Sequence, residues 1–296
     1  MRGLWTALIT PFKEGNGIDN PVDYPALERL LNMQIDAGVD GVLLLGTTWE
    51  RPTLLEAEEI ELIKFSINIL KGKTKIMVNA GTYSTLDSVN TVKYLDEMDH
   101  IDAYLVVNPY YNKPTQTGLK QHFVTVANQT SRPVFLYNIA GRTGVNIETP
   151  TLLEIIEETS NVVWVKEASG DMNQIKEVIS KTPDDFLVLS WDDGLIYDLI
   201  RSGGDGTICV TSNCEPKVIK NFVDDCLSGD SKASETNKYL QALFSNMFAQ
   251  TNPLPAKTYL AQKWIISENF RLPMCPMDET QRKKLLEFMN TYQLPE

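Results

Sequence analysis

The sequence predicts a (β/α)8 TIM barrel with a C-terminal helical appendage. Three observations support this fold: apolar runs typical of buried strands recur eight times, a helical pattern follows each run, and the last part of the chain is helical throughout. The chain has 296 residues, of which 43% are hydrophobic and 22% charged, and this suits one large core. We predict the barrel at 1–228 and the helical segment, packed on the barrel, at 229–296.

The predicted strands are short runs rich in Val, Ile and Leu. Near-continuous apolar runs are typical of parallel strands that are buried on both faces. The runs lie at 4–9, 41–45, 75–79, 103–107, 133–137, 162–166, 186–190 and 206–210.

Stretches with helical periodicity separate these runs. They lie at 25–38, 53–70, 88–98, 117–130, 149–158, 172–181, 194–204 and 215–229. Strict alternation of strand and helix predicts a parallel sheet. Eight units without a break favour closure into a barrel over the alternative, an open doubly wound sheet. Three further helices are predicted at 232–250, 255–269 and 278–292.

Charge and composition narrow the possible partners. The formal net charge of −12 disfavours nucleic acid and anionic membranes. The four cysteines form no C-x-x-C pair and the two histidines lie far from them, so zinc-site spacing is missing. The acidic pair Asp192–Asp193 is expected to cap the following helix rather than to bind a cation. No apolar run reaches the roughly 20 residues of a membrane span, and we expect a cytoplasmic protein.

Lys166 is the main candidate for chemistry. In a barrel of this type the active site lies at the C-terminal ends of the strands, and Lys166 closes an entirely apolar run. Burial lowers the pKa of a lysine, which leaves a neutral amine that attacks carbonyl carbons. The alternative is a structural ion pair between Lys166 and the adjacent Glu167 or another carboxylate at the rim of the barrel.

Four further polar residues close or follow neighbouring strands. Tyr137 ends the fifth run, where a phenol beside the amine could relay protons; the alternative is a structural hydrogen bond. Thr47 and Thr48 follow a glycine and offer hydroxyl and N–H groups to a carboxylate, although such turns are common. Arg142 sits between glycines and is suited to bidentate carboxylate binding, with an idle surface arginine as the alternative.

Together these segments resemble the dihydrodipicolinate synthase (4-hydroxy-tetrahydrodipicolinate synthase) family of the N-acetylneuraminate lyase superfamily. The resemblance covers essentially the whole chain. It rests on G-T-T-x-E at 46–50, Y-Y-N-K-P at 110–114, Y-N-I-A-G-R-T-G at 137–144, V-K-E-A-S-G at 165–170, G-G-D-G-T-I-C-V-T-S-N from 203, N-P-L-P-A-K from 252 and R-L-P-M from 271.

The resemblance implies a role for each matching residue. Lys166 would form a Schiff base with pyruvate, and Tyr137, Thr48 and Tyr111 would relay protons, with Tyr111 reaching into a neighbouring subunit. Thr47 and Thr48 would hold the pyruvate carboxylate, and Arg142 that of the second substrate. Ala7 and Ile208 would line the pyruvate pocket. The resemblance further implies a homotetramer, a dimer of dimers, with no metal or organic cofactor.

The implied reaction is a class I aldolase-type condensation. Pyruvate would combine with L-aspartate 4-semialdehyde to give 4-hydroxy-tetrahydrodipicolinate, a step towards diaminopimelate and lysine. Two alternatives stay open: another pyruvate-dependent aldolase of the superfamily with a different aldehyde acceptor, and a catalytically silent or repurposed barrel, natural or engineered.

Two tryptophans depart from the family pattern. Trp49 stands in G-T-T-x-E and Trp191 in S-W-D-D, where the family usually has glycine or another small residue. Each ring has two possible positions. It either fills pocket volume that a substrate needs, or it points away from the pocket to the surface or a subunit contact, and the sequence alone does not distinguish the two. A need for positive φ at either residue would add strain.

Overall fold

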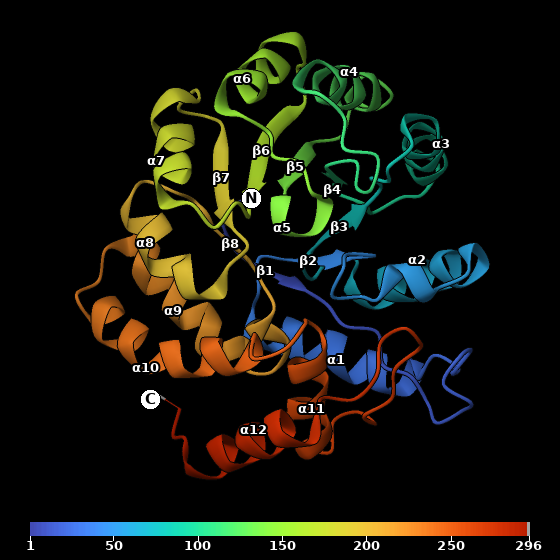
Figure 1. The fold of residues 1–296 in the computed structure, drawn as a ribbon, viewed down its shortest axis with the longest axis vertical. Coiled ribbons are helices and arrows are strands. Elements are labelled where there is room, and N and C mark those ends of the chain that lie inside the picture. Colours follow the sequence, from blue (N-terminus) through green and yellow to red (C-terminus); the bar gives the residue numbers. More distant parts are fainter. Residues whose placement is uncertain (295–296) are drawn as a thin grey trace.

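The computed structural model describes residues 1–294 and confirms the closed barrel. Eight parallel strands are hydrogen-bonded in chain order, and β8 pairs with β1 to close the ring. The strands form the centre of the molecule in Figure 1 and the helices surround them. The strands are β1 Gly3–Ala7, β2 Gly41–Leu44, β3 Lys75–Asn79, β4 Ala103–Val107, β5 Val134–Asn138, β6 Val162–Glu167, β7 Leu187–Ser190 and β8 Gly206–Cys209.

The helices alternate with the strands as predicted, with two additions. Each interstrand helix lies within a few residues of its predicted range. Short 3₁₀ turns precede α2, α8 and α9, and a four-residue helix, α5, follows β5 where we predicted a loop. The helices of the barrel are α1 Tyr24–Ala37, α2 Glu56–Leu70, α3 Thr85–Asp96, α4 Gln116–Ala127, α5 Ala140–Thr143, α6 Thr149–Glu158, α7 Met172–Lys181, α8 Ile196–Arg201 and α9 Pro216–Ser228.

The C-terminal segment is helical, and one helix is shorter than predicted. It contains α10 Lys232–Met247, α11 Leu254–Gln262 and α12 Glu279–Thr291. The predicted helix at 255–269 ends at Gln262 because Trp264 adopts a φ of 58°, which breaks the helical hydrogen-bond pattern. The chain then returns along the barrel, where the buried Arg271 donates a hydrogen bond from Nε to the carbonyl of Asn20 (2.9 Å).

A buried ion pair joins this segment to the barrel. Lys257 of α11 places its ammonium 2.6 Å from a carboxylate oxygen of Glu50, and both side chains are at most 1% exposed. The ammonium also lies 4.5 Å from the ring centroids of Phe12 and Phe270, an arrangement that favours a cation. Because removal of either charge would leave the other buried without a counter-ion, the pair fixes α11 against the loop after β2.

The barrel interior is filled by apolar side chains, with three aromatic rings at its base. Trp5 of β1 lies 6.0 Å from Phe135 of β5 and 6.4 Å from Trp164 of β6, measured between ring centroids. These edge-to-face and tilted contacts are the favoured arrangements of aromatic pairs. The rings exclude water from the interior beneath the C-terminal strand ends.

Gly41 of β2 makes room for this aromatic cluster. It pairs in register with Trp5, and a Cβ placed on Gly41 would lie 2.2 Å from two carbons of the Trp5 ring. The indole has no free volume to move into, since Trp5 is completely buried. The glycine is therefore required by packing, not by backbone conformation.

Among the described residues, no helix combines the length and hydrophobicity needed to cross a membrane.

We predict that Gly41→Ala destabilises the protein by about 1–3 kcal/mol, because the added methyl group overpacks the barrel interior. Urea unfolding followed by circular dichroism measures the change. Gly118→Ala is the matched control: it adds the same methyl group within α4, where the nearest atom, a side-chain carbon of Pro114, is 3.3 Å away. Alanine is the better helix former and this contact is far less tight than that at Gly41, so Gly118→Ala should change stability much less than Gly41→Ala does. Equal stability of Gly41→Ala and the wild type would refute the packing argument.

Candidate active site

A cavity of about 240 Å³ opens at the C-terminal ends of the strands. Six of the eight site residues predicted from sequence line it, and they come from loops and strands that are far apart in the chain. These residues are Ala7, Thr47, Thr48, Tyr137, Arg142 and Lys166. Since pockets for drug-sized ligands measure about 300–1,000 Å³, the volume fits small substrates.

Lys166 lies at the base of this cavity without a counter-ion. Its side chain is 2% exposed, and no carboxylate among residues 1–294 forms an ion pair with it. Burial lowers the pKa of Lys166 to about 7; the positive charge of Arg142 acts in the same direction, and Asp193 opposes both. Because the ammonium is costly to keep in this dry site, about half of the amine is neutral at pH 7, and the neutral form predominates at higher pH.

The alternative of a Lys166–Glu167 ion pair is wrong. Successive side chains of a strand point to opposite faces, so Glu167 faces away from the barrel interior. Its carboxylate accepts hydrogen bonds from the N–H of Ser169 (2.8 Å) and from Asn138 Nδ2 (3.2 Å). Glu167 thus holds the loop after β6, while Lys166 alone faces the cavity.

Tyr137 stands beside Lys166 on the adjacent strand. The two residues are register partners of β5 and β6, and the lysine amine lies 4.2 Å from the centroid of the tyrosine ring. The Tyr137 hydroxyl is buried and has no hydrogen-bond partner among the described residues. Burial raises the pKa of Tyr137 above its ordinary value, and Arg142 partly offsets this. The phenol therefore stays protonated, and its proton is free to engage a bound molecule.

Thr47 and Thr48 lie on a tight turn after β2. The turn is closed by hydrogen bonds from the N–H of Trp49 to the carbonyl of Gly46 (3.1 Å) and from the N–H of Glu50 to the carbonyl of Thr47 (3.0 Å). Glu50 has a left-handed φ of 58°, which turns the chain away from the cavity. The turn leaves both threonines on the cavity wall.

Arg142 extends from the short helix α5 into the cavity wall. It forms no ion pair in the described structure, and one guanidinium nitrogen donates to the carbonyl of Asn252 (3.4 Å). A guanidinium without a counter-ion beside a cavity is an available partner for a carboxylate.

Two predicted site residues do not line the cavity of this chain. Ile208 lies in the apolar cluster of the barrel interior, together with Ala7 and Tyr137, but beneath the cavity wall. Tyr111 is 92% exposed with a φ of 73°, and its neighbour Tyr110 lines the cavity instead. Within a single chain, Tyr111 is therefore outside the site.

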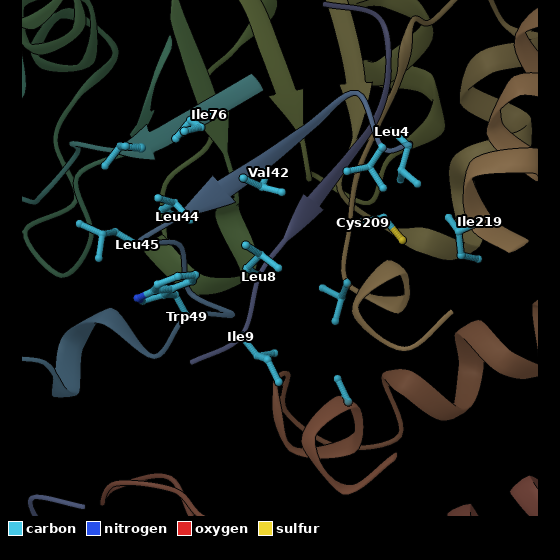
Figure 2. Close-up of a cluster of buried hydrophobic side chains, with 14 of the residues drawn as sticks. Leu4, Leu8, Ile9, Val42, Leu44, Leu45, Trp49, Ile76, Cys209 and Ile219 are labelled. Atoms are coloured by element: carbon cyan, nitrogen blue, oxygen red, sulfur yellow. The ribbon is translucent and has the colours of Figure 1, made fainter. Parts of the chain in front are cut away.

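The two tryptophans have different positions. Trp49 is completely buried in the outer core, so it neither points outward nor enters the cavity; Figure 2 shows it among Leu8, Leu44 and Leu45. Trp191 does line the cavity, and its ring meets Phe248 edge to face at 5.6 Å. Neither tryptophan has a positive φ, so neither strains the backbone.

Asp193 is a site residue that the sequence reasoning assigned to helix capping alone. Asp192 provides the cap, accepting from the N–H of Gly194 (2.9 Å). The carboxylate of Asp193 is buried and accepts from the N–H (2.7 Å) and hydroxyl (2.5 Å) of Thr211, joining the ends of β7 and β8. Its negative charge raises the pKa of Lys166 against the effect of burial. Two consecutive carboxylates at a strand end, with only one needed as a cap, were the available signal.

No group of three or more His, Cys, Asp and Glu side chains within residues 1–294 is arranged to hold a metal ion. The main reactive group on the cavity wall is the buried amine of Lys166, whose pKa is lowered to about 7. Fold and site together define a (β/α)8-barrel protein with a lysine suited to attack a carbonyl group.

Comparison with known proteins places the chain in a family. The model of the dihydrodipicolinate synthetase family matches residues 1–291, and the chain belongs to this family of enzymes. A relative from Chloroherpeton thalassium, named 4-hydroxy-tetrahydrodipicolinate synthase, is 40% identical over 286 residues, 96% of this chain and 93% of its own length.

Solved structures agree over the whole fold. A crystal structure of dihydrodipicolinate synthase from Aquifex aeolicus has a TM-score of 0.94 at 38% identity and covers 100% of this chain and 99% of its own. A chloride-inhibited dihydrodipicolinate synthase from Acinetobacter baumannii, complexed with pyruvate, has a TM-score of 0.93 at 33% identity, with 98% of each chain covered.

We predict that Lys166 becomes reactive as the pH rises through about 7, because deprotonation exposes the amine lone pair. Competitive labelling with acetic anhydride between pH 5.5 and 10, followed by peptide mass mapping, measures this. The exposed Lys283 in the same digest is the internal reference. An ordinary lysine would reach half reactivity only near pH 10.4, and that result for Lys166 would contradict the desolvation argument.

Proposed function

We propose that this enzyme condenses pyruvate with L-aspartate 4-semialdehyde to form 4-hydroxy-tetrahydrodipicolinate, in the pathway to diaminopimelate and lysine. The observation that carries the proposal is the buried, unpaired Lys166 with a pKa of about 7 at the base of a small cavity. Membership of the family, and relatives that bear the synthase name over nearly their full length, support the same reaction.

The reaction begins with an imine. The neutral amine of Lys166 attacks the keto carbon of pyruvate, and loss of water gives a protonated Schiff base. Thr47 and Thr48 offer hydroxyl groups to the pyruvate carboxylate at the cavity wall. The iminium withdraws electrons from the adjacent methyl group, which loses a proton and becomes an enamine. The covalent imine supplies the electron sink, and we therefore propose that the enzyme uses no cofactor.

Carbon–carbon bond formation follows. The enamine carbon attacks the aldehyde carbon of the second substrate, whose oxygen takes up a proton. Tyr137 is placed for this transfer because its hydroxyl is buried, protonated and without another partner. The amino group of the second substrate then attacks the imine carbon, closes the ring and releases Lys166. Arg142 is the available partner for the carboxylate of the second substrate.

A second candidate function rests on Trp191. Its indole lies on the cavity wall, so it influences which aldehyde fits. This position favours, as the runner-up, another pyruvate-dependent aldolase of the same superfamily with a different acceptor. Trp49 gives no such support, since it is buried away from the cavity. The third possibility, a silent barrel, would require that Lys166 form no imine.

One experiment separates these possibilities. Borohydride reduction in the presence of pyruvate should attach a reduced pyruvate to Lys166, and Lys166→Met should abolish the adduct and lower turnover at least about 10³-fold. The rate of condensation of pyruvate with L-aspartate 4-semialdehyde should exceed the rates at which the enzyme cleaves N-acetylneuraminate and 2-keto-3-deoxygluconate. Trp191→Ala should keep the adduct and relax this substrate preference. Trp49→Phe should keep both the adduct and the wild-type preference. If the wild type prefers a sugar-derived substrate, the result supports an aldolase with a different acceptor. If Lys166 stays unmodified, the result supports the silent barrel.

We further propose that the enzyme is a cytoplasmic homotetramer, a dimer of dimers, in which Tyr111 completes the site of a neighbouring subunit. The 92% exposure of Tyr111 in a single chain supports this, as do Tyr83 and Leu86, two exposed apolar side chains. Large exposed apolar side chains that gather on one surface are typical of subunit contacts. The described cysteines are all unpaired, in keeping with a reducing compartment.

We predict that Tyr111→Phe lowers turnover by about 10²-fold or more, because the relay loses one hydroxyl. Steady-state kinetics measure this, and sedimentation velocity checks that the variant assembles as the wild type does. The exposed Tyr239, which lies on α10, provides the control variant Tyr239→Phe. Wild-type turnover in Tyr111→Phe would remove this residue from the relay.

A further inference from the structure

Three consecutive residues of the loop after β2 are held by groups from distant parts of the chain. Asn252 donates a hydrogen bond from Nδ2 to the hydroxyl oxygen of Thr48 (2.7 Å). The hydroxyl of Thr10 donates to the carbonyl of Trp49 (2.6 Å). Lys257 forms the buried ion pair with Glu50 described above. Two of these three contacts come from the C-terminal segment, which lies more than 200 residues further along the chain.

The Thr48 contact has a defined direction. The amide nitrogen of asparagine only donates, so the hydroxyl oxygen of Thr48 must accept, and its own hydrogen must be donated elsewhere. No other hydrogen bond to this hydroxyl exists within residues 1–294, and Thr48 lines the cavity. The hydrogen of Thr48 is therefore available to a molecule bound in the cavity.

Asn252 acts from behind the cavity wall. It is 3% exposed and does not line the cavity, while its main-chain carbonyl oxygen accepts from Arg142 (3.4 Å). One buried residue thus contacts two of the side chains to which the proposed function assigns the substrate carboxylates. In the described structure the side-chain amide of Asn252 forms its only hydrogen bond to Thr48, so Thr48 is the direct route from this amide to the cavity.

We propose that Asn252 is a positioning residue: its amide turns the Thr48 hydroxyl so that this group donates its hydrogen to the pyruvate carboxylate. The proposal rests on the proposed function. It assigns to the C-terminal segment a part in binding the first substrate, in addition to its part in stability. The Lys257–Glu50 pair keeps Asn252 and Thr48 at bonding distance by fixing α11 to the loop.

A double-mutant cycle tests the proposal, with the rate of Lys166–pyruvate adduct formation and kcat/KM for pyruvate as readouts. Asn252→Leu should lower kcat/KM about 10- to 100-fold, mainly through KM, because a hydrogen bond to a charged carboxylate is weakened. In the Thr48→Val background no hydroxyl remains to be oriented. There, Asn252→Leu should lower kcat/KM for pyruvate by less than about threefold.

The matched control is Asn20→Leu. Asn20 is also a buried amide between barrel and C-terminal segment, since its Nδ2 donates to the carbonyl of Phe270 (2.8 Å), but it does not contact the cavity wall residues. It should lose stability in urea unfolding yet keep the wild-type KM for pyruvate.

The outcomes are distinct. Equal losses from Asn252→Leu with and without the Thr48 hydroxyl, or a matching rise of KM in Asn20→Leu, would overturn the positioning role while the function stands. Failure of the wild type to form any pyruvate adduct would overturn both. A loss confined to the background that retains the Thr48 hydroxyl supports the proposal.

Discussion

The dry interior of the barrel is the constraint on which the site depends. Trp5, Phe135 and Trp164 fill the base of the closed sheet, so that a lysine at the end of β6 meets apolar side chains below it and no counter-ion around it. The resulting loss of hydration makes the amine a nucleophile at neutral pH. One physical cause, the exclusion of water by packed apolar side chains, thus stabilises the closed barrel and makes the lysine at its mouth reactive.

The C-terminal segment completes the site from outside the barrel. Burying the Lys257–Glu50 pair removes two charges from water, and their attraction, the Phe12 and Phe270 rings and the tight packing offset that cost. An apolar pair would hold α11 against the barrel with less desolvation. An ion pair defines the position of the helix more narrowly. Because Glu50 belongs to the loop that carries Thr47 and Thr48, the pair also fixes the position of this loop.

Much of this could be predicted from sequence because the relevant signals are local. Each strand is a near-continuous apolar run, and Lys166 is conspicuous because it ends such a run with a charge. The alternation of side chains along β6 also separates Lys166 from Glu167, once the strand is known to face the interior. The early end of α11 was not foreseen, since nothing in its apolar pattern marks the left-handed conformation of Trp264.

Contacts between distant segments could not be predicted. Trp49 and Trp191 both follow strands in polar loops, and only the turn geometry sends one ring into the outer core and the other to the cavity wall. Asn252 likewise has no local signal for its contact with Thr48, which lies in a distant part of the chain. The paired carboxylates marked Asp193, but its contact with Thr211 at the end of another strand could not be read from the sequence.

The desolvation of Lys166 also links the folding equilibrium to pH. Its folded pKa of about 7 lies below the roughly 10.4 of an unfolded lysine, so between these values the unfolded chain holds a proton that the folded chain has released. Below pH 7 both states are protonated, and the buried ammonium opposes folding by roughly 4–5 kcal/mol. This opposition fades as the pH rises from 7 towards 10.4. The rest of the fold must therefore be stable enough to carry a reactive group that favours the unfolded chain.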